Sequence, residues 1–314
     1  MFKRVFLIFI ALLMLFSNNL LAQGDYDYSS KKFWQELYSK NKVVDYPLIF
    51  IHGIGANIDY WKQSMEAIDP DYYEMRFIAE DKIYHNYDGK KKDYTIWGIS
   101  YYTLNPMEEA LRGNLDLYAL RVEKMVNLIK DLTGKDKVII VAHSMGGLVS
   151  RRYMTLSQNN WDSVHKILTV GTPNEGVKTS VELVGQLVDL KEGSLFLNKL
   201  NKDWQKLSLD NSAKLWGVVG GIDKSMPFNL ETDPDATDSA GAGFVSIASS
   251  IPYGEWKSAV GDNFNISYFD TPNFGFRLAV DATHMELLFH QGTFRGIAWT
   301  LTNFTANEKG REEF

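Results

Sequence analysis

The feature that most constrains the fold is a strand, a turn and a helix that follow one another without a linker. Residues 138–141 (VIIV) form an unbroken apolar run, which is typical of a β-strand buried on both faces. The segment 142–147 (AHSMGG) comes directly after this run, and the pattern at 148–156 predicts a helix. Ala142 and Gly146 are small enough for neighbouring chain to pass close to a sharp turn between them.

Short apolar runs alternate with longer amphipathic ones on both sides of this turn. Strands are predicted at 48–51, 167–170 and 215–219, and apolar residues at helical spacing predict a helix over 118–132 that ends at Gly134. Strands that alternate with helices favour an α/β fold with a mostly parallel central sheet and helices on both faces. The composition, 45% hydrophobic and 23% charged, is that of a packed globular protein.

The pattern changes between residues 176 and 212. Apolar residues recur there at helical spacing over a stretch that is long for a single connection between strands. Two interpretations fit: a helical cap or lid over a site, or extra helices packed on the sheet. In either case we expect one domain over 23–314.

Residues 1–22 have the features of an export signal. Lys3 and Arg4 precede an apolar run at 5–16, and a polar break and Leu20-Leu21-Ala22 follow. This order is typical of a secretory signal peptide, and the run is short for a membrane span. An uncleaved anchor is the alternative. We expect a secreted or periplasmic protein.

Charge and residue types exclude several classes of function. Removal of 1–22 takes away two of the 33 basic and none of the 39 acidic residues, which leaves a net charge of −8 and argues against a nucleic-acid partner. The chain has no cysteine and no nucleotide-binding or zinc-protease motif, so no cofactor or catalytic metal is expected. The acidic loop 231–238 would suit Ca²⁺, although such loops are more often simply solvated. No feature implies a stable protein partner.

A second motif closes the first apolar run. Residues 52–55 (HGIG) follow the predicted strand 48–51, and with AHSMGG they resemble the bacterial secreted lipases and esterases of the α/β-hydrolase superfamily. Residues 171–176 (GTPNEG) resemble the segment that precedes the lid in those lipases, with Asn174 in place of the usual His. The similarity covers about residues 46–292. It implies the α/β-hydrolase fold and hydrolysis of carboxylic esters, with lipids or other apolar acyl esters as substrates.

The resemblance also assigns roles to residues. Ser144 is the expected nucleophile, and the main-chain N–H groups of Ile54 and Met145 are the expected oxyanion hole. The chain order in this fold is Ser, acid, His, which removes His52, His85 and His143. His165 is expected just before a strand and His290 inside a helix. His284, in a loop after the apolar residues 278–280, is therefore the expected general base.

The acid has two candidates. In the related lipases an Asp precedes the segment that corresponds to 243–245, and here that position is Ala242. Asp238 lies four residues earlier in the same loop and is the favoured acid. Asp223, which follows the predicted strand at 215–219, is the alternative. An acyltransferase or amidase with the same triad is an alternative function. Because of Ala242, a non-catalytic binding protein on a hydrolase scaffold is another.

Overall fold

The structure is a computed structural model that describes residues 27–39, 43–80, 82–90, 94–103, 109, 112–178, 185–210, 215–223, 237–238, 245–252, 254–256, 266–268 and 274–303. The predicted export signal, Ala242 and most of the acidic loop 231–238 lie outside these residues. Within the described part of the chain, none of the helices combines the length and apolarity that crossing a membrane requires.

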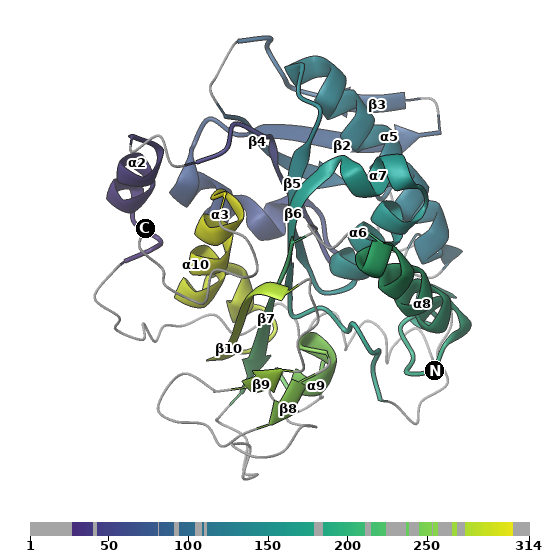
Figure 1. Cartoon of the computed structure of the whole chain (residues 1–314). Coiled ribbons are helices and arrows are strands. Elements are labelled where there is room, and N and C mark those ends of the chain that lie inside the picture. The colour runs from purple at the N-terminus through teal and green to yellow at the C-terminus, as the bar shows by residue number, and fades with distance from the viewer. Residues whose placement is uncertain are drawn as a thin grey trace, which may run out of the picture.

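An eight-stranded sheet runs through the centre of the protein (Figure 1), in the order β10–β7–β6–β5–β1–β4–β2–β3. All neighbouring strands are parallel except β2 and β3. The strands are β1 (Leu48–Ile51), β2 (Tyr73–Ala79), β3 (Lys82–His85), β4 (Ile96–Ser100), β5 (Val138–His143), β6 (Val164–Val170), β7 (Leu215–Ile222) and β10 (Phe274–Asp281). β8 (Gly254–Trp256) and β9 (Ile266–Tyr268) form a separate antiparallel pair.

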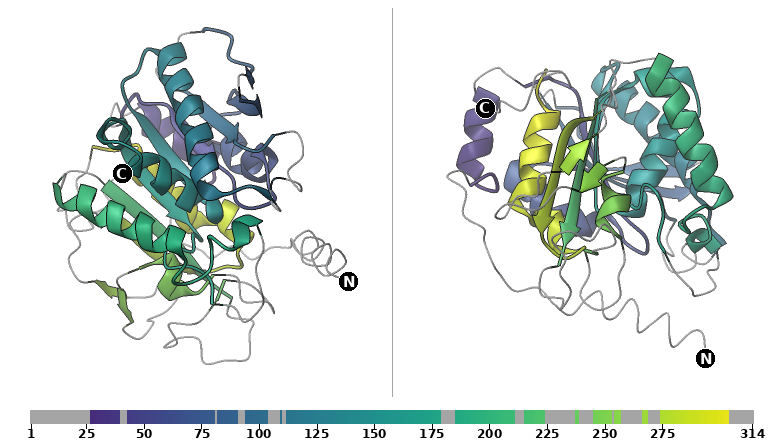
Figure 2. Two further views of the ribbon diagram at one scale, coloured as in Figure 1. Left: turned by 90° about the vertical axis from the view of Figure 1, so that its right-hand side faces the viewer. Right: turned by 60° about the horizontal axis from the view of Figure 1, so that its bottom comes forward.

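Helices cover both faces of this sheet (Figure 2). One face carries α5 (Leu115–Thr133), α6 (Met145–Thr155), α7 (Gln158–Asp162) and α8 (Leu195–Asp210), and the other carries α2 (Lys31–Ser39), α3 (Lys62–Ile68) and α10 (Gln291–Thr300). The shorter elements are α9 (Ile247–Ser250) and the 3₁₀ helices η1 (Ile58–Trp61), η2 (Gly185–Leu187) and η3 (Glu286–Phe289). The predicted α/β-hydrolase fold, with helices on both faces of a mostly parallel sheet, is confirmed.

The two faces explain why the strands are unbroken apolar runs. In β1, Ile49 and Ile51 belong to the core under α5 and α6, whereas Leu48 and Phe50 belong to the core under α3 and α10. A strand that is buried on both sides has no position for a polar side chain.

The helix predicted over 118–132 is α5, and both of its ends have a chemical cause. Asn114 caps the first turn by accepting a hydrogen bond from the N–H of Leu117, which is worth about 1 kcal/mol in comparable helices. At the other end Gly134 has a φ of 69°, a left-handed conformation that stops the helix and favours glycine.

The long segment at 176–212 contains a core helix. Leu200 and Trp204 of α8 are buried, and the Trp204 ring contacts Trp161 of α7 and Trp216 of β7. α8 therefore packs on the sheet layer, as the second of the two interpretations predicted. Residues 179–184 and 211–212 lie outside the described part, and a lid stays a prediction.

Two local predictions were wrong. His165 lies inside β6 rather than before it, because the pairing of β5 with β6 shifts by one residue between Val164 and Lys166, and a β-bulge accommodates the extra residue. His290 is not inside a helix. It lies between η3 and α10, where its Nδ1 accepts a hydrogen bond from the N–H of Gly292 at 3.0 Å.

Candidate active site

The site lies where β1 and β5 end, side by side in the middle of the sheet. The chain continues from β1 to strands on one side of it and later returns to β5 on the other side. The carboxyl ends of the strands at such a reversal leave a crevice, which is where open α/β sheets bind their ligands. Residues 52–55 follow β1, and Ser144 follows β5.

Ser144 has a strained backbone. Its φ of 55° and ψ of −133° make it the single non-glycine residue with positive φ in the part of the chain that the structure describes. Its N–H donates to the carbonyl of Val170 at 2.8 Å, and α6 begins at the next residue. The turn is therefore the sharp bend that the small residues around it predicted.

Two glycines allow the loop after β1 to lie against this turn. A Cβ on Gly146 would come within 2.3 Å of the carbonyl oxygen of His52, and a Cβ on Gly53 would come within 2.8 Å of Cβ of Ser144. Both approaches are closer than any side chain allows. Ile54, the residue after Gly53, is thus held next to the serine.

Met145 is the first residue of α6, with Ser144 in the N-cap position. The first N–H groups of a helix have no acceptor inside the helix and form its positive end. The N–H groups of Ile54 and Met145 are therefore in the two segments that meet at Ser144, and their role as an oxyanion hole stays a prediction.

His284 and Asp238 form a buried pair. Nδ1 of His284 donates a hydrogen bond to Oδ2 of Asp238 at 2.6 Å, and the side chains of both residues are almost inaccessible to solvent. The other carboxylate oxygen, Oδ1, accepts from the N–H of Val245 at 3.2 Å. A carboxylate fixed in this way sets the orientation of the imidazole and leaves its Nε2 as the reactive nitrogen.

The end of β6 brings this pair to the serine. Val170 accepts the N–H of Ser144, and a Cβ on the following Gly171 would lie 3.2 Å from both Asp238 Oδ2 and His284 Cε1. Ser144 therefore lies beside Val170, and the His284–Asp238 pair lies beside the next residue, Gly171.

Asp223, the other candidate acid, supports the same region through its backbone. It follows β7 and its N–H donates to the carbonyl of Thr237 at 3.0 Å, next to Asp238. The carboxylate that contacts Nδ1 of His284 is that of Asp238.

His143 connects the turn to the loop of His284, a role that chain order alone did not suggest. Nε2 of His143 donates to the carbonyl of His284 at 2.9 Å, and the two rings lie 4.5 Å apart. Burial, together with the nearby His284, lowers the pKa of His143 well below its ordinary value, so the ring is neutral. The sequence feature that could have indicated this role is the position of His143, a polar residue at the end of an otherwise apolar strand.

Asn174, the departure from the related lipases, has a structural role. Its Oδ1 accepts from the buried guanidinium of Arg151 at 3.0 Å, and its Nδ2 donates to the carbonyl of Ser250 at 3.0 Å. Asn174 therefore ties the segment after β6 to α6 and α9.

The described residues contain no group of three or more His, Cys, Asp or Glu side chains that could hold a metal ion. Of the acidic loop that would suit Ca²⁺, only Thr237 and Asp238 are described, and Asp238 is engaged with His284.

Comparison with known proteins supports the fold and identifies the family. The most similar folds include the lin2722 product of Listeria innocua (TM-score 0.56, 17% identity, 84% of this chain and 96% of that chain). They also include the mature Bacillus licheniformis lipase BlEst2 (TM-score 0.50, 14% identity, 82% and 93%).

A relative in sequence is phospholipase A(1) LCAT3 of Arabidopsis thaliana, which is 25% identical over 154 residues. The match covers 45% of this chain, and the chain spans about a third (33%) of the length of that relative. The model of the PGAP1-like alpha/beta domain matches residues 42–236, which is more than half of the chain and includes the loop after β1, Ser144 and Asp223. The protein belongs to the PGAP1-like alpha/beta domain family.

Proposed function

We propose that this protein is an exported serine hydrolase that cleaves carboxylic esters through a Ser144–His284–Asp238 triad. The observation that carries the proposal is the buried hydrogen bond between His284 and Asp238, beside a serine held at positive φ at the start of a helix. A strained serine, an oriented imidazole and two main-chain donors are the parts that acyl transfer needs.

In this mechanism Oγ of Ser144 attacks the ester carbonyl while Nε2 of His284 takes the hydroxyl proton. The N–H groups of Ile54 and Met145 stabilise the oxyanion of the tetrahedral intermediate, and each such donor is worth about 3 kcal/mol in comparable enzymes. The C–O bond then breaks, and His284 gives its proton to the departing alcohol. Water attacks the acyl-enzyme by the same route, with His284 as base, and the carboxylic acid leaves.

Lipids or other apolar acyl esters are the proposed substrates. A phospholipase and a lipase are among the proteins that this chain resembles, and the apolar residues of 1–22 support export to the periplasm or the medium. Asp238 also supplies the carboxylate that Ala242 lacks, which favours an enzyme over a non-catalytic binding protein.

The test uses a fluorophosphonate probe and a series of p-nitrophenyl esters. Wild type should be labelled and should hydrolyse the esters, with a preference among acyl chain lengths, while Ser144→Ala should lose both the labelling and the turnover. Parallel assays with amides and with alcohol acceptors would identify an amidase or an acyltransferase. A folded wild type that neither reacts with the probe nor cleaves any ester would refute the proposal.

A further inference from the structure

We propose that Tyr101 and Tyr102 are positioning residues that hold the oxyanion loop, residues 52–55, in its active geometry. The inference deepens the proposed function and rests on it. Neither tyrosine is assigned a contact with substrate, and both would act through the N–H of Ile54.

The two hydroxyls hold the loop on either side of Ile54. The hydroxyl of Tyr101 donates to the carbonyl of His52 at 3.1 Å, and the hydroxyl of Tyr102 accepts from the N–H of Gly55 at 3.3 Å. Gly55 has a φ of 63°, and Gly53 and Gly55 have no side chains that could pack. A loop with two glycines has many accessible backbone conformations, so its shape depends on contacts from outside.

The tyrosines themselves are fixed. Both are almost fully buried, and the Tyr101 ring stacks on the imidazole of His52 with centroids 4.2 Å apart and planes 12° from parallel. The hydroxyl of Tyr102 donates its proton to Oε1 of Gln186 at 3.1 Å, so an oxygen lone pair is left for the N–H of Gly55. Burial raises the pKa of each tyrosine, so both hydroxyls stay protonated at any working pH.

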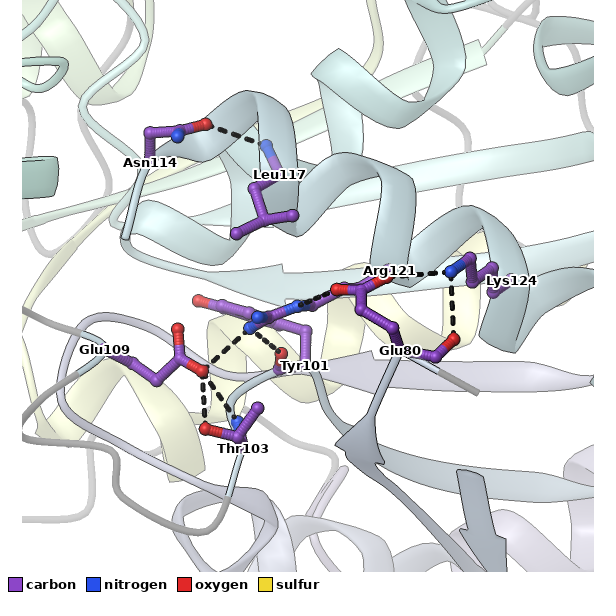
Figure 3. A network of polar contacts seen from close by, with 8 residues as sticks. All are labelled: Glu80, Tyr101, Thr103, Glu109, Asn114, Leu117, Arg121 and Lys124. Atoms are coloured by element: carbon purple, nitrogen blue, oxygen red, sulfur yellow. Dashed lines mark hydrogen bonds and ion pairs between the residues drawn. The ribbon is translucent and has the colours of Figure 1, made fainter. Parts of the chain in front are cut away.

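A buried ion pair holds the backbone at Tyr101 and Thr103, the two neighbours of Tyr102 in the chain (Figure 3). The guanidinium of Arg121, on α5, donates to the carbonyl of Tyr101 at 3.2 Å and to Oε1 of Glu109 at 2.9 Å. The same carboxylate oxygen accepts from the N–H of Thr103 at 3.2 Å. A continuous chain of hydrogen bonds therefore runs from α5 through residues 101–103 to the oxyanion loop.

The consequence concerns the transition state. An oxyanion-hole donor acts only when it lies about 3 Å from the position of the developing charge. Removal of a phenolic oxygen frees one end of the loop while the N–H of Ile54 is retained. The expected loss in kcat is about tenfold, which is smaller than the 100-fold or greater loss that follows removal of a donor.

The experiment compares Tyr102→Phe and Tyr101→Phe with Tyr153→Phe. Tyr153 is also fully buried and lies near the C-terminal end of α6, whereas the oxyanion loop lies at its N-terminal end. The hydroxyl of Tyr153 contacts that of Ser163 at 2.7 Å. For each variant, kcat and KM with a p-nitrophenyl ester and the Kd of a boronic acid that mimics the tetrahedral intermediate are measured. We expect kcat and boronate affinity to fall together in the first two variants, with KM within twofold of wild type, and to stay unchanged in Tyr153→Phe.

The outcomes separate this inference from the proposed function. A wild type without Ser144-dependent turnover would refute the function itself. An active wild type with unchanged kcat and boronate affinity in Tyr102→Phe would overturn the positioning role alone, and so would an equal loss in Tyr153→Phe. Should Tyr102→Phe fail to fold, the same readouts in Tyr101→Phe decide, since this change frees the carbonyl of His52 at the other end of the loop.

Discussion

Acid should destabilise the protein through His52, which is buried at the end of β1. Burial lowers the pKa of this imidazole from 6.5 to about 4, with a smaller effect in the same direction from the charge of Arg76. The neutral ring is well accommodated, because Nδ1 donates to the carbonyl of Gly53 at 2.8 Å and Nε2 accepts from the hydroxyl of Ser100 at 3.3 Å. A charged ring carries a proton on Nε2 as well, so the Ser100 hydroxyl could no longer donate to it and would have to turn and accept instead.

The magnitude follows from proton linkage. Between pH 6.5 and 4 the unfolded chain binds a proton at His52 that the folded protein does not bind, so the stability due to the neutral ring is complete above pH 6.5 and falls as the pH is lowered. One pKa unit corresponds to about 1.4 kcal/mol, so the expected loss from His52 is about 2 kcal/mol by pH 5 and about 3 kcal/mol by pH 4. Proteins of ordinary stability have only about 5–15 kcal/mol to lose.

The assay is chemical unfolding followed by tryptophan fluorescence, at pH 8, 5 and 4, for wild type and His52→Gln. Glutamine can still donate and accept hydrogen bonds, but it does not take up a proton. The variant should be less stable at pH 8 and should lose about 3 kcal/mol less than wild type between pH 8 and 4. The pKa of His143 is also lowered, chiefly by burial, and this ring is present in both proteins, so most of the difference comes from His52. The same pH dependence in both proteins would refute the reasoning.

Three further changes test the site and the fold. Asp238→Asn should lower kcat on the order of 1,000-fold or more, while Asp223→Asn should lower it far less, and full turnover in the former would exclude Asp238 as the acid. Gly146→Ala should lower the free energy of unfolding by about 2 kcal/mol or more, since the new Cβ would come within 2.3 Å of the His52 carbonyl oxygen, and wild-type stability would contradict that close approach. Lys166→Met should lower the free energy of unfolding in denaturant by about 3 kcal/mol, because the buried ammonium donates to the carbonyls of Trp299 and Thr302. The same change at the exposed Lys32 is the control and should be nearly neutral.

Local patterns were enough to predict the fold and the position of Ser144. The apolar run at 138–141 and the small residues around Ser144 lie within ten positions of one another. The strand, the bend and α6 could therefore be inferred from these neighbours alone, without knowledge of distant residues. The start of β6 could not be predicted in this way, because it depends on a β-bulge in the pairing with β5.

The sequence favoured Asp238 over Asp223 as the candidate acid but could not decide between them, because the position of each carboxylate depends on segments far apart in the chain. Asp223 and Asp238 are adjacent in space, since the N–H of Asp223 bonds to Thr237, and both approach the end of β7. What distinguishes them is a bridge between Thr237 and Ser246 and the bond from Val245 N–H to the Asp238 carboxylate, which turn Asp238 toward His284. No local pattern contains that information.

The polar residues that support the site follow a common physical rule. β4, β1 and β5 lie side by side, and each ends at or next to a buried polar ring: Tyr101, His52 and His143. Beyond the last strand residue the sheet no longer supplies hydrogen bonds, yet the loops there are buried, and their carbonyls need donors. The three rings supply them, to His52, Gly53 and His284 respectively. A polar residue at the end of an otherwise apolar strand is therefore evidence that the loop after the strand is buried. Here the three rings hold two loops: residues 52–55, which carry the proposed oxyanion donor Ile54, and the loop of the proposed base His284.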